Sequence, residues 1–262
     1  MVKLFLIFIF LSLQSQAFLE KKLSASALYN PVGTGISLGL AYNYKLWGQS
    51  DLDIEKTSEK PPEKKSWMYG YIRPKVQADI SGLINGAAVE LQIFPISIFG
   101  VTFGSQYIDR HIKKTAYFDC DLVNCENELN RDYWKINLAL SYSGFVSLLQ
   151  YQKDRYQIRD DNQLFMEYSS LLLLSKDQLN LEKKIAFLGH EITDQLTLGL
   201  LEFYQELGPK KAEAQFLTGM YKYEDKKIFA GIGTSGSDYT EKYIALFVKL
   251  TWVLDLTLSL VD

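Results

Sequence analysis

Histidine, cysteine and arginine are scarce in this sequence of 262 residues. It contains two His, two Cys and five Arg, and its formal net charge is -3. A closed zinc site takes four ligands, so we expect no metal site, and we predict no cofactor. Because the charge is near neutral and arginines are few, we also exclude nucleic acid as a partner.

Long apolar runs are scarce too. The run LFLIFIFLSL at residues 4–13 follows a short basic start and precedes the small residues Ser15 and Ala17. This pattern predicts a cleaved secretory signal peptide over residues 1–17. A membrane anchor is the alternative, but the run is about half as long as a spanning helix. No later run approaches that length, so we expect no transmembrane helix in the mature chain.

Helical periodicity is missing, and alternation with a period of two takes its place. In ISLGLAYNYKLW, residues 36–47, the even positions are large and apolar or aromatic, while the odd positions up to Lys45 are small or polar. The same alternation returns in 99–107, 133–142 and 243–252, where Phe247 interrupts the polar face. A period of two indicates β-strands that have two different faces.

Weaker alternation fills most of the remaining chain, which gives about twelve strands within a range of 10–14. These segments are 67–80, 86–94, 145–157, 163–174, 182–192, 196–205, 212–223 and 227–234. The run LLLL breaks the alternation in 163–174, and residues 19–29 and 253–261 could each add a strand. Most connectors are short and carry turn residues, which favours antiparallel hairpins.

Two connectors are long, near residues 48–66 and 108–131, and they are polar enough to be solvated loops. Three predicted strands separate them. An odd number of antiparallel strands between two loops places the loops at opposite ends of the sheet. The alternatives are that one of the three segments is not a full strand, or that Pro74 divides one of them into two. The sequence otherwise indicates a single domain over residues 18–262.

Strands of about ten residues with one apolar and one small or polar face, behind a signal peptide, resemble bacterial outer-membrane β-barrel proteins. This resemblance implies an all-β fold, a single antiparallel transmembrane β-barrel, located in the outer membrane with lipid as its partner. The ending TLSLVD departs from the class, because many members end in Phe. The alternative is a soluble periplasmic β-barrel or sandwich, with the apolar faces turned inward.

The resemblance assigns the two faces of the strands. The residues expected to face lipid are Leu38, Leu40, Ile136, Leu138, Leu246 and Val248. The residues expected in the lumen are Lys45, Lys135, Asn137 and Lys249. Buried charges need partners, so we expect the lumen lysines to pair with acids such as Glu90 and Glu202.

The two cysteines, Cys120 and Cys125, lie five residues apart in a polar segment. In an oxidising envelope compartment this spacing predicts a disulfide that closes a small loop. A metal pair is the alternative. Only His111 is near enough in sequence to add a ligand, and one His does not complete a site.

Residues for covalent catalysis are not evident. Serine-hydrolase barrels use a His to activate a Ser, but neither His111 nor His190 has a Ser two residues later. Carboxylate pairs such as Asp160 and Asp161 lie in polar connectors. We therefore predict no catalytic residues and a non-enzymatic, narrow channel or small-solute transporter. The alternative is a structural or surface-interaction barrel that acts through its long loops, and the sequence sets no oligomeric state.

Overall fold

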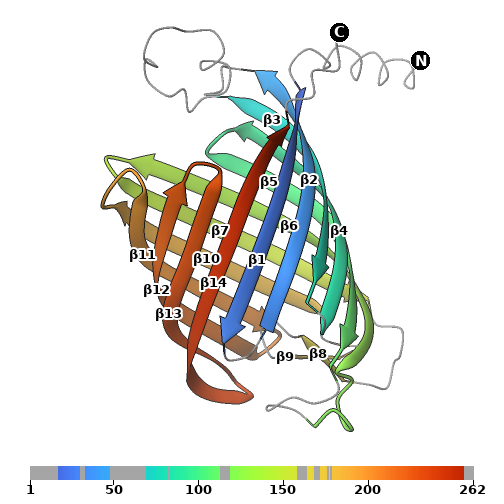
Figure 1. Cartoon of the computed structure of the whole chain (residues 1–262). Helices are drawn as coiled ribbons and strands as arrows, with labels where there is room; N and C mark the ends of the chain where they lie inside the picture. Colours follow the sequence, from blue (N-terminus) through green and yellow to red (C-terminus); the bar gives the residue numbers. More distant parts are fainter. Residues whose placement is uncertain are drawn as a thin grey trace, which may run out of the picture.

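The computed structural model describes residues 17–29, 33–47, 69–81, 83–112, 119–157, 164–167, 172–175, 177 and 179–256. Within these residues, twelve antiparallel strands close into one barrel (Figure 1). Their bounds are β1 Ala17–Tyr29, β2 Gly33–Trp47, β3 Gly70–Ile80, β4 Ile84–Ile96, β5 Phe99–His111, β6 Glu126–Tyr142, β7 Phe145–Gln157, β10 Asn180–Glu191, β11 Leu196–Leu207, β12 Lys210–Tyr223, β13 Lys226–Ser237 and β14 Thr240–Leu256. The predicted all-β barrel of about twelve strands is confirmed.

The barrel closes where β1 pairs with β14, and every other barrel strand pairs with its neighbours in sequence, with β7 next to β10. The hairpins follow local turn chemistry. At the β6–β7 turn, Ser143 and Gly144 both have positive φ, at 50° and 80°. Positive φ at both central residues is what a two-residue turn needs to match the twist of the strands.

The predicted strand at 163–174 is wrong as a barrel strand. This segment instead contains a short separate hairpin, β8 Phe165–Glu167 with β9 Leu172–Leu174. The segment 19–29 supplies a barrel strand in its place, as β1. At the other end of the chain, β14 continues through residue 252 to Leu256 as one strand.

The two long connectors start from opposite ends of the barrel. β2 ends, and β3 begins, at the end where β1 starts and β14 finishes, which is the top of Figure 1. The β5–β6 connection lies at the other end, because β3, β4 and β5 are all full strands and Pro74 pairs with Leu91 inside β3. This connection covers 112–125, since both strands extend into the predicted loop 108–131. The predicted 48–66 loop and residues 1–16 of the predicted signal peptide lie outside the described residues.

The outer face of the barrel is apolar. Leu38, Val248 and Leu200 are 51%, 45% and 64% exposed on β2, β14 and β11. The alternate positions on the same strands face the interior, as Ala41 and Ala245 do at 4% and 1%. A soluble barrel would place the apolar set inside, so the exterior is of the kind that membrane barrels present to lipid.

No described segment forms a helix that is both long enough and apolar enough to cross a membrane.

Candidate functional site

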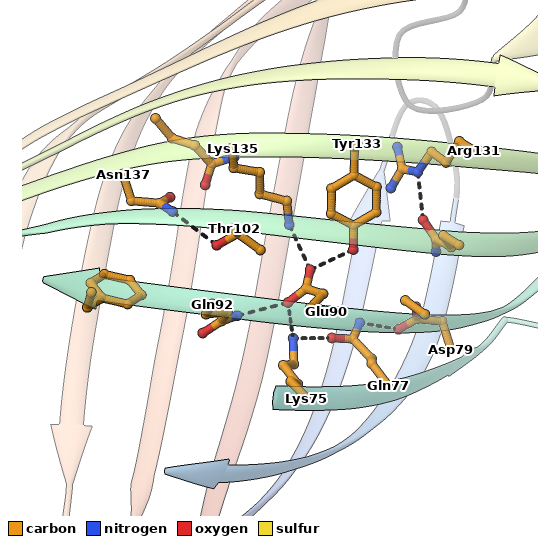
Figure 2. Close-up of a pocket in the computed structure, with 14 residues that line it drawn as sticks. Lys75, Gln77, Asp79, Glu90, Gln92, Thr102, Arg131, Tyr133, Lys135 and Asn137 are labelled. Carbon is orange, nitrogen blue, oxygen red and sulfur yellow. Dashed lines mark hydrogen bonds and ion pairs between the residues drawn. The ribbon is translucent and has the colours of Figure 1, made fainter. Parts of the chain in front are cut away.

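The interior contains a polar cavity of about 390 Å³ against the wall formed by β3 to β7 (Figure 2). All of its lining side chains are polar except Ala88 and Phe94. They come from positions two residues apart on adjacent strands, such as Lys75, Gln77 and Asp79 on β3. The alternation of each strand therefore builds one continuous polar surface, here called the polar wall.

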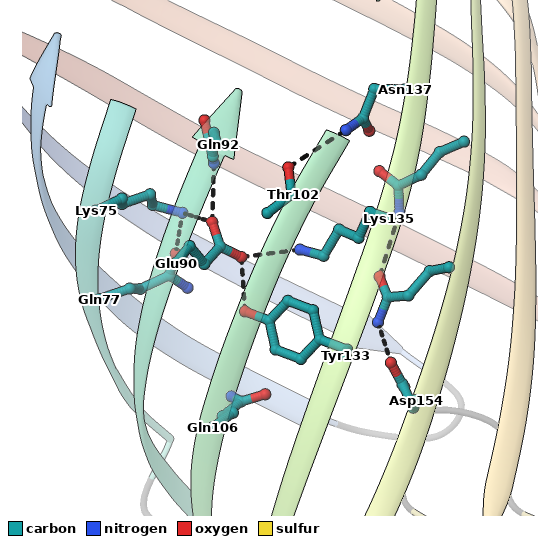
Figure 3. Close-up of polar contacts among 12 residues, drawn as sticks. Lys75, Gln77, Glu90, Gln92, Thr102, Gln106, Tyr133, Lys135, Asn137 and Asp154 are labelled. Carbon is teal, nitrogen blue, oxygen red and sulfur yellow. Dashed lines mark hydrogen bonds and ion pairs between the residues drawn. The ribbon is translucent and has the colours of Figure 1, made fainter. Parts of the chain in front are cut away.

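Glu90 on β4 is the centre of this wall (Figure 3). Its Oε1 accepts hydrogen bonds from Lys135 Nζ at 2.8 Å and Tyr133 OH at 2.7 Å. Its Oε2 accepts from Gln92 Nε2 at 2.8 Å and lies 3.4 Å from Lys75 Nζ. The carboxylate is 7% exposed, so two cations and two further donors offset the cost of removing it from water.

Tyr133 reaches Glu90 across a glycine. It pairs directly with Gly104 on β5, and a Cβ at Gly104 would overlap the Tyr133 ring. Glycine in a strand permits such close approach by a neighbouring side chain. The ring also lies near two cations, with Lys135 Nζ 4.6 Å and Arg131 Cζ 5.3 Å from its centroid. The small residue therefore makes room for a ring instead of leaving open space.

A second carboxylate, Asp154 on β7, neutralises cations next to the cavity. It is fully buried, 3.0 Å from Arg131 Nη1 and 3.3 Å from Lys183 Nζ. Gln152 Nε2 donates to its other oxygen at 2.5 Å. The charges on the polar wall are thus largely paired within the wall.

The opposite side of the lumen is packed with apolar side chains from β7 and β10 to β14. We call it the aromatic wall. Its rings meet edge to face, with centroids 6.2 Å apart for Phe203 and Phe216 and 5.1 Å apart for Phe216 and Phe247. Its buried members are Phe187, Leu201, Phe216 and Ala245. This wall fills its half of the lumen as a hydrophobic core, so the cavity lies off-centre.

One mouth of the barrel is filled. Met166, Leu172 and Leu174 of the β8–β9 hairpin have no exposed surface. They pack on the ends of β6, β7, β10, β11 and β12 at this mouth, and on Ile112, Val123 and Cys125. Figure 1 shows the hairpin at this mouth, opposite the end where β1 begins.

The predicted lumen residues occupy inward positions. Lys135 and Asn137 line the cavity, and Asn137 Nδ2 lies 3.5 Å from Thr102 Oγ1. Lys45 and Lys249 lie on the inner faces of β2 and β14, one residue away from the outward Tyr44 and Val248. The expected pairing with Glu90 is present for Lys135. The expectation for Glu202 is wrong, because it is exposed on the outer face, where it accepts from Gln215.

The residues expected to face lipid lie on the outer face. Leu38, Leu40, Leu246 and Val248 are 38–51% exposed, and Ile136 and Leu138 are half-buried between the inward Lys135, Asn137 and Ala139. The predicted disulfide is present, with Cys120 and Cys125 joined and their Cα atoms 5.5 Å apart.

The two histidines lie outside the lumen site. His111 Nε2 is 2.9 Å from Asp109 Oδ2 at the exposed end of β5. The His190 ring lies against Phe145 in a tilted arrangement, with centroids 4.7 Å apart, on the outer face of β10. Among the described residues, no group of three His, Cys, Asp or Glu side chains is arranged to hold a metal ion.

Sequence reasoning missed the aromatic wall and the hairpin in the mouth. Each had a signal. Phe247 interrupted the polar face of its strand, and LLLL broke the alternation in 163–174. Both apolar exceptions lie inside the barrel, where they pack on other apolar side chains.

No protein-family model matches the chain, and no curated protein matches it. Solved structures of similar fold include the KdgM porin, which is 10% identical with a TM-score of 0.46 over 89% of this chain and 98% of that one. An outer membrane channel from Pseudomonas putida F1 is 8% identical with a TM-score of 0.48, over 91% and 94%. The NanC porin is 9% identical with a TM-score of 0.45, over 89% and 100%.

Proposed function

We propose that the protein is an outer-membrane β-barrel, without enzymatic activity, that passes small polar solutes along a narrow path beside the polar wall. The observation that carries this proposal is the polar cavity of about 390 Å³ inside a closed barrel. Its size and its position against one wall support a narrow path. Because Glu90 and Asp154 neutralise the neighbouring cations, we expect a small conductance with weak ion preference.

The outer face supports the membrane location. Large apolar side chains such as Ile80, Val89 and Ile244 are 62–64% exposed there. In water this surface would be a single large apolar patch, whereas in a bilayer it meets lipid. Exposed aromatic residues lie at strand ends, as Trp47 and Tyr142 do, which is where the lipid–water interface would lie.

Conductance in a planar bilayer tests the channel. Wild-type protein should give small discrete current steps. Gln92→Trp, which adds bulk to the cavity, should reduce the step size, while Val89→Trp on the outer face of the same strand should not. Equal effects of the two variants would contradict the proposal. Lys183 lies 3.5 Å from Glu167 of the hairpin that fills the mouth, so we expect Lys183→Met to loosen that hairpin. Silence of both the wild type and Lys183→Met would also contradict the proposal.

A structural or surface-interaction barrel is the second candidate. The apolar hairpin that fills one mouth favours it, because a barrel that never conducts could keep such a hairpin permanently. Folded protein that stays silent in every variant, while its external loops still bind another surface component, would support this candidate.

A further inference from the structure

The described residues that fill the mouth form one unit, here called the mouth plug: residues 119–125, and residues 164–167 with 172–174. Asn124 joins the two parts. Its N–H donates to the Leu164 carbonyl at 2.7 Å, and its carbonyl accepts from the Met166 N–H at 3.3 Å. Cys125 and Met166 belong to the same buried cluster. The disulfide loop and the hairpin are therefore expected to move together.

Two polar contacts fasten the mouth plug to the barrel. The first is Arg110 of β5, which is 2% exposed. Its guanidinium donates to the carbonyls of Met166 at 2.8 Å and Asn124 at 3.2 Å, and so holds both parts of the plug. It also donates to the Glu126 carbonyl, where β6 begins.

The second contact is Glu167 of β8. It accepts from Tyr156 OH at 3.1 Å and lies 3.5 Å from Lys183 Nζ. Lys183 has a second carboxylate partner in the wall, Asp154 at 3.3 Å. If the plug leaves, Lys183 keeps Asp154 as its partner, so Lys183 itself is not left as an unpaired charge.

The Glu167–Lys183 contact also connects the plug to the cavity. Asp154 contacts both Lys183 and Arg131, and Arg131 lines the polar cavity. A series of ion pairs, from Glu167 through Lys183 and Asp154 to Arg131, thus connects the plug to the polar wall. We propose that the mouth plug is a gate on the polar path, closed in this structure and released as a unit, with Glu167 and Lys183 as its latch. This inference rests on the proposed channel, because a gate presupposes a path.

Thiol labelling in lipid vesicles tests release of the plug without measuring current. Met166→Cys places a thiol on a fully buried position of β8, while the two native cysteines remain in their disulfide. It should react slowly with a membrane-impermeant maleimide. Adding Lys183→Met should raise the labelling rate about tenfold, because it removes the cation that lies 3.5 Å from the buried Glu167 carboxylate of the plug. Leu172→Cys, fully buried on β9, is a second reporter that should respond in the same way.

Lys153→Met is the matched control. It breaks the Lys153–Glu182 ion pair, 3.2 Å long, between β7 and β10 on the outer face, where Glu182 is next in sequence to Lys183. It should leave labelling of both reporters unchanged. Equal labelling in Lys183→Met and Lys153→Met would overturn the gate.

Planar-bilayer recording completes the test. Lys183→Met should raise the fraction of time that the channel is open by about tenfold, for the same reason, and Lys153→Met should not. If the wild type, Lys183→Met and Lys153→Met all conduct, and neither substitution changes the labelling rate or the open time, the gate is contradicted but the channel is not. Faster labelling without current in any protein would instead contradict the proposed channel.

Discussion

The polar wall and the aromatic wall share a glycine–aromatic pair between neighbouring strands, but the aromatic ring makes different contacts in each. In each, a glycine pairs across the ladder with an aromatic residue, Gly104 with Tyr133 and Gly231 with Phe247. In each, a Cβ on the glycine would overlap the ring. On the polar wall the ring carries a hydroxyl that donates to Glu90. On the aromatic wall the Phe247 ring meets other rings instead.

This difference decides where solvent can enter the lumen. Polar side chains around a buried carboxylate keep a cavity that water can fill, since every group needs a hydrogen-bond partner. Phenyl rings have no such requirement and pack against one another. A barrel of uniform strand pattern can therefore have one polar, water-accessible half and one apolar, packed half. The first two predictions below test that division.

The largest loss of stability is expected on the aromatic wall. Phe216 is 6% exposed and contacts rings on two sides. Phe216→Ala should lower the free energy of unfolding by about 3–5 kcal/mol, through lost packing and the cavity left behind. Urea unfolding in lipid vesicles measures it. Leu217→Ala, next in sequence but outward and 61% exposed, is the control, and an equal loss there would mean that the faces are misassigned.

On the polar wall, Glu90→Ala should cost about 3 kcal/mol in the same assay, because it leaves Lys75 and Lys135 without their shared carboxylate. Glu90→Gln should cost less, since the amide oxygen still accepts from Tyr133. Glu202→Ala, an exposed carboxylate on the outer face, should stay within about 0.5 kcal/mol of wild type. A Glu90→Ala barrel as stable as wild type would show that the network is not structural.

The outer face gives the next effect. Leu138→Arg should cost about 2–4 kcal/mol if the residue lies near the bilayer midplane. Tyr142→Arg, at the end of the same strand and 84% exposed, should cost only about 0–1 kcal/mol, as expected near the interface. The same unfolding assay separates the two. No depth dependence between these variants would argue against a membrane location.

The smallest effect on the barrel is expected from the disulfide. Cys120→Ser opens a ring with only four residues between the cysteines, so the loss should be below the ~3 kcal/mol expected for a fifteen-residue loop. The disulfide should shape the mouth plug more than the barrel, so labelling at Leu172→Cys should rise when both Cys120 and Cys125 are replaced by Ser. Native thiols that react with an alkylating reagent before reduction would contradict the bond itself.

Alternation in the sequence was enough to predict the barrel, and the spacing of the two cysteines was enough to predict the disulfide. The sequence placed Glu90 among the expected partners of the lumen lysines, Lys135 included, but it could not predict the full network, because Lys75, Glu90 and Lys135 lie on three strands and meet only through their register. It also led to an error at Glu202, where alternation alone did not show which face points inward. The count of twelve was right although one member was wrong, since LLLL belongs to the hairpin and residues 19–29 supply β1.

The central claim is that the conducting path follows the polar wall. Modification of single cysteines during planar-bilayer recording, in the Lys183→Met background, tests it most directly. Gln92→Cys lies in the polar cavity, and Thr218→Cys lies on the inner face of β12 among the phenyl rings and is 2% exposed. A charged methanethiosulfonate reagent should reduce the current through Gln92→Cys and leave Thr218→Cys unchanged. Block at Thr218→Cys with no change at Gln92→Cys would contradict the account.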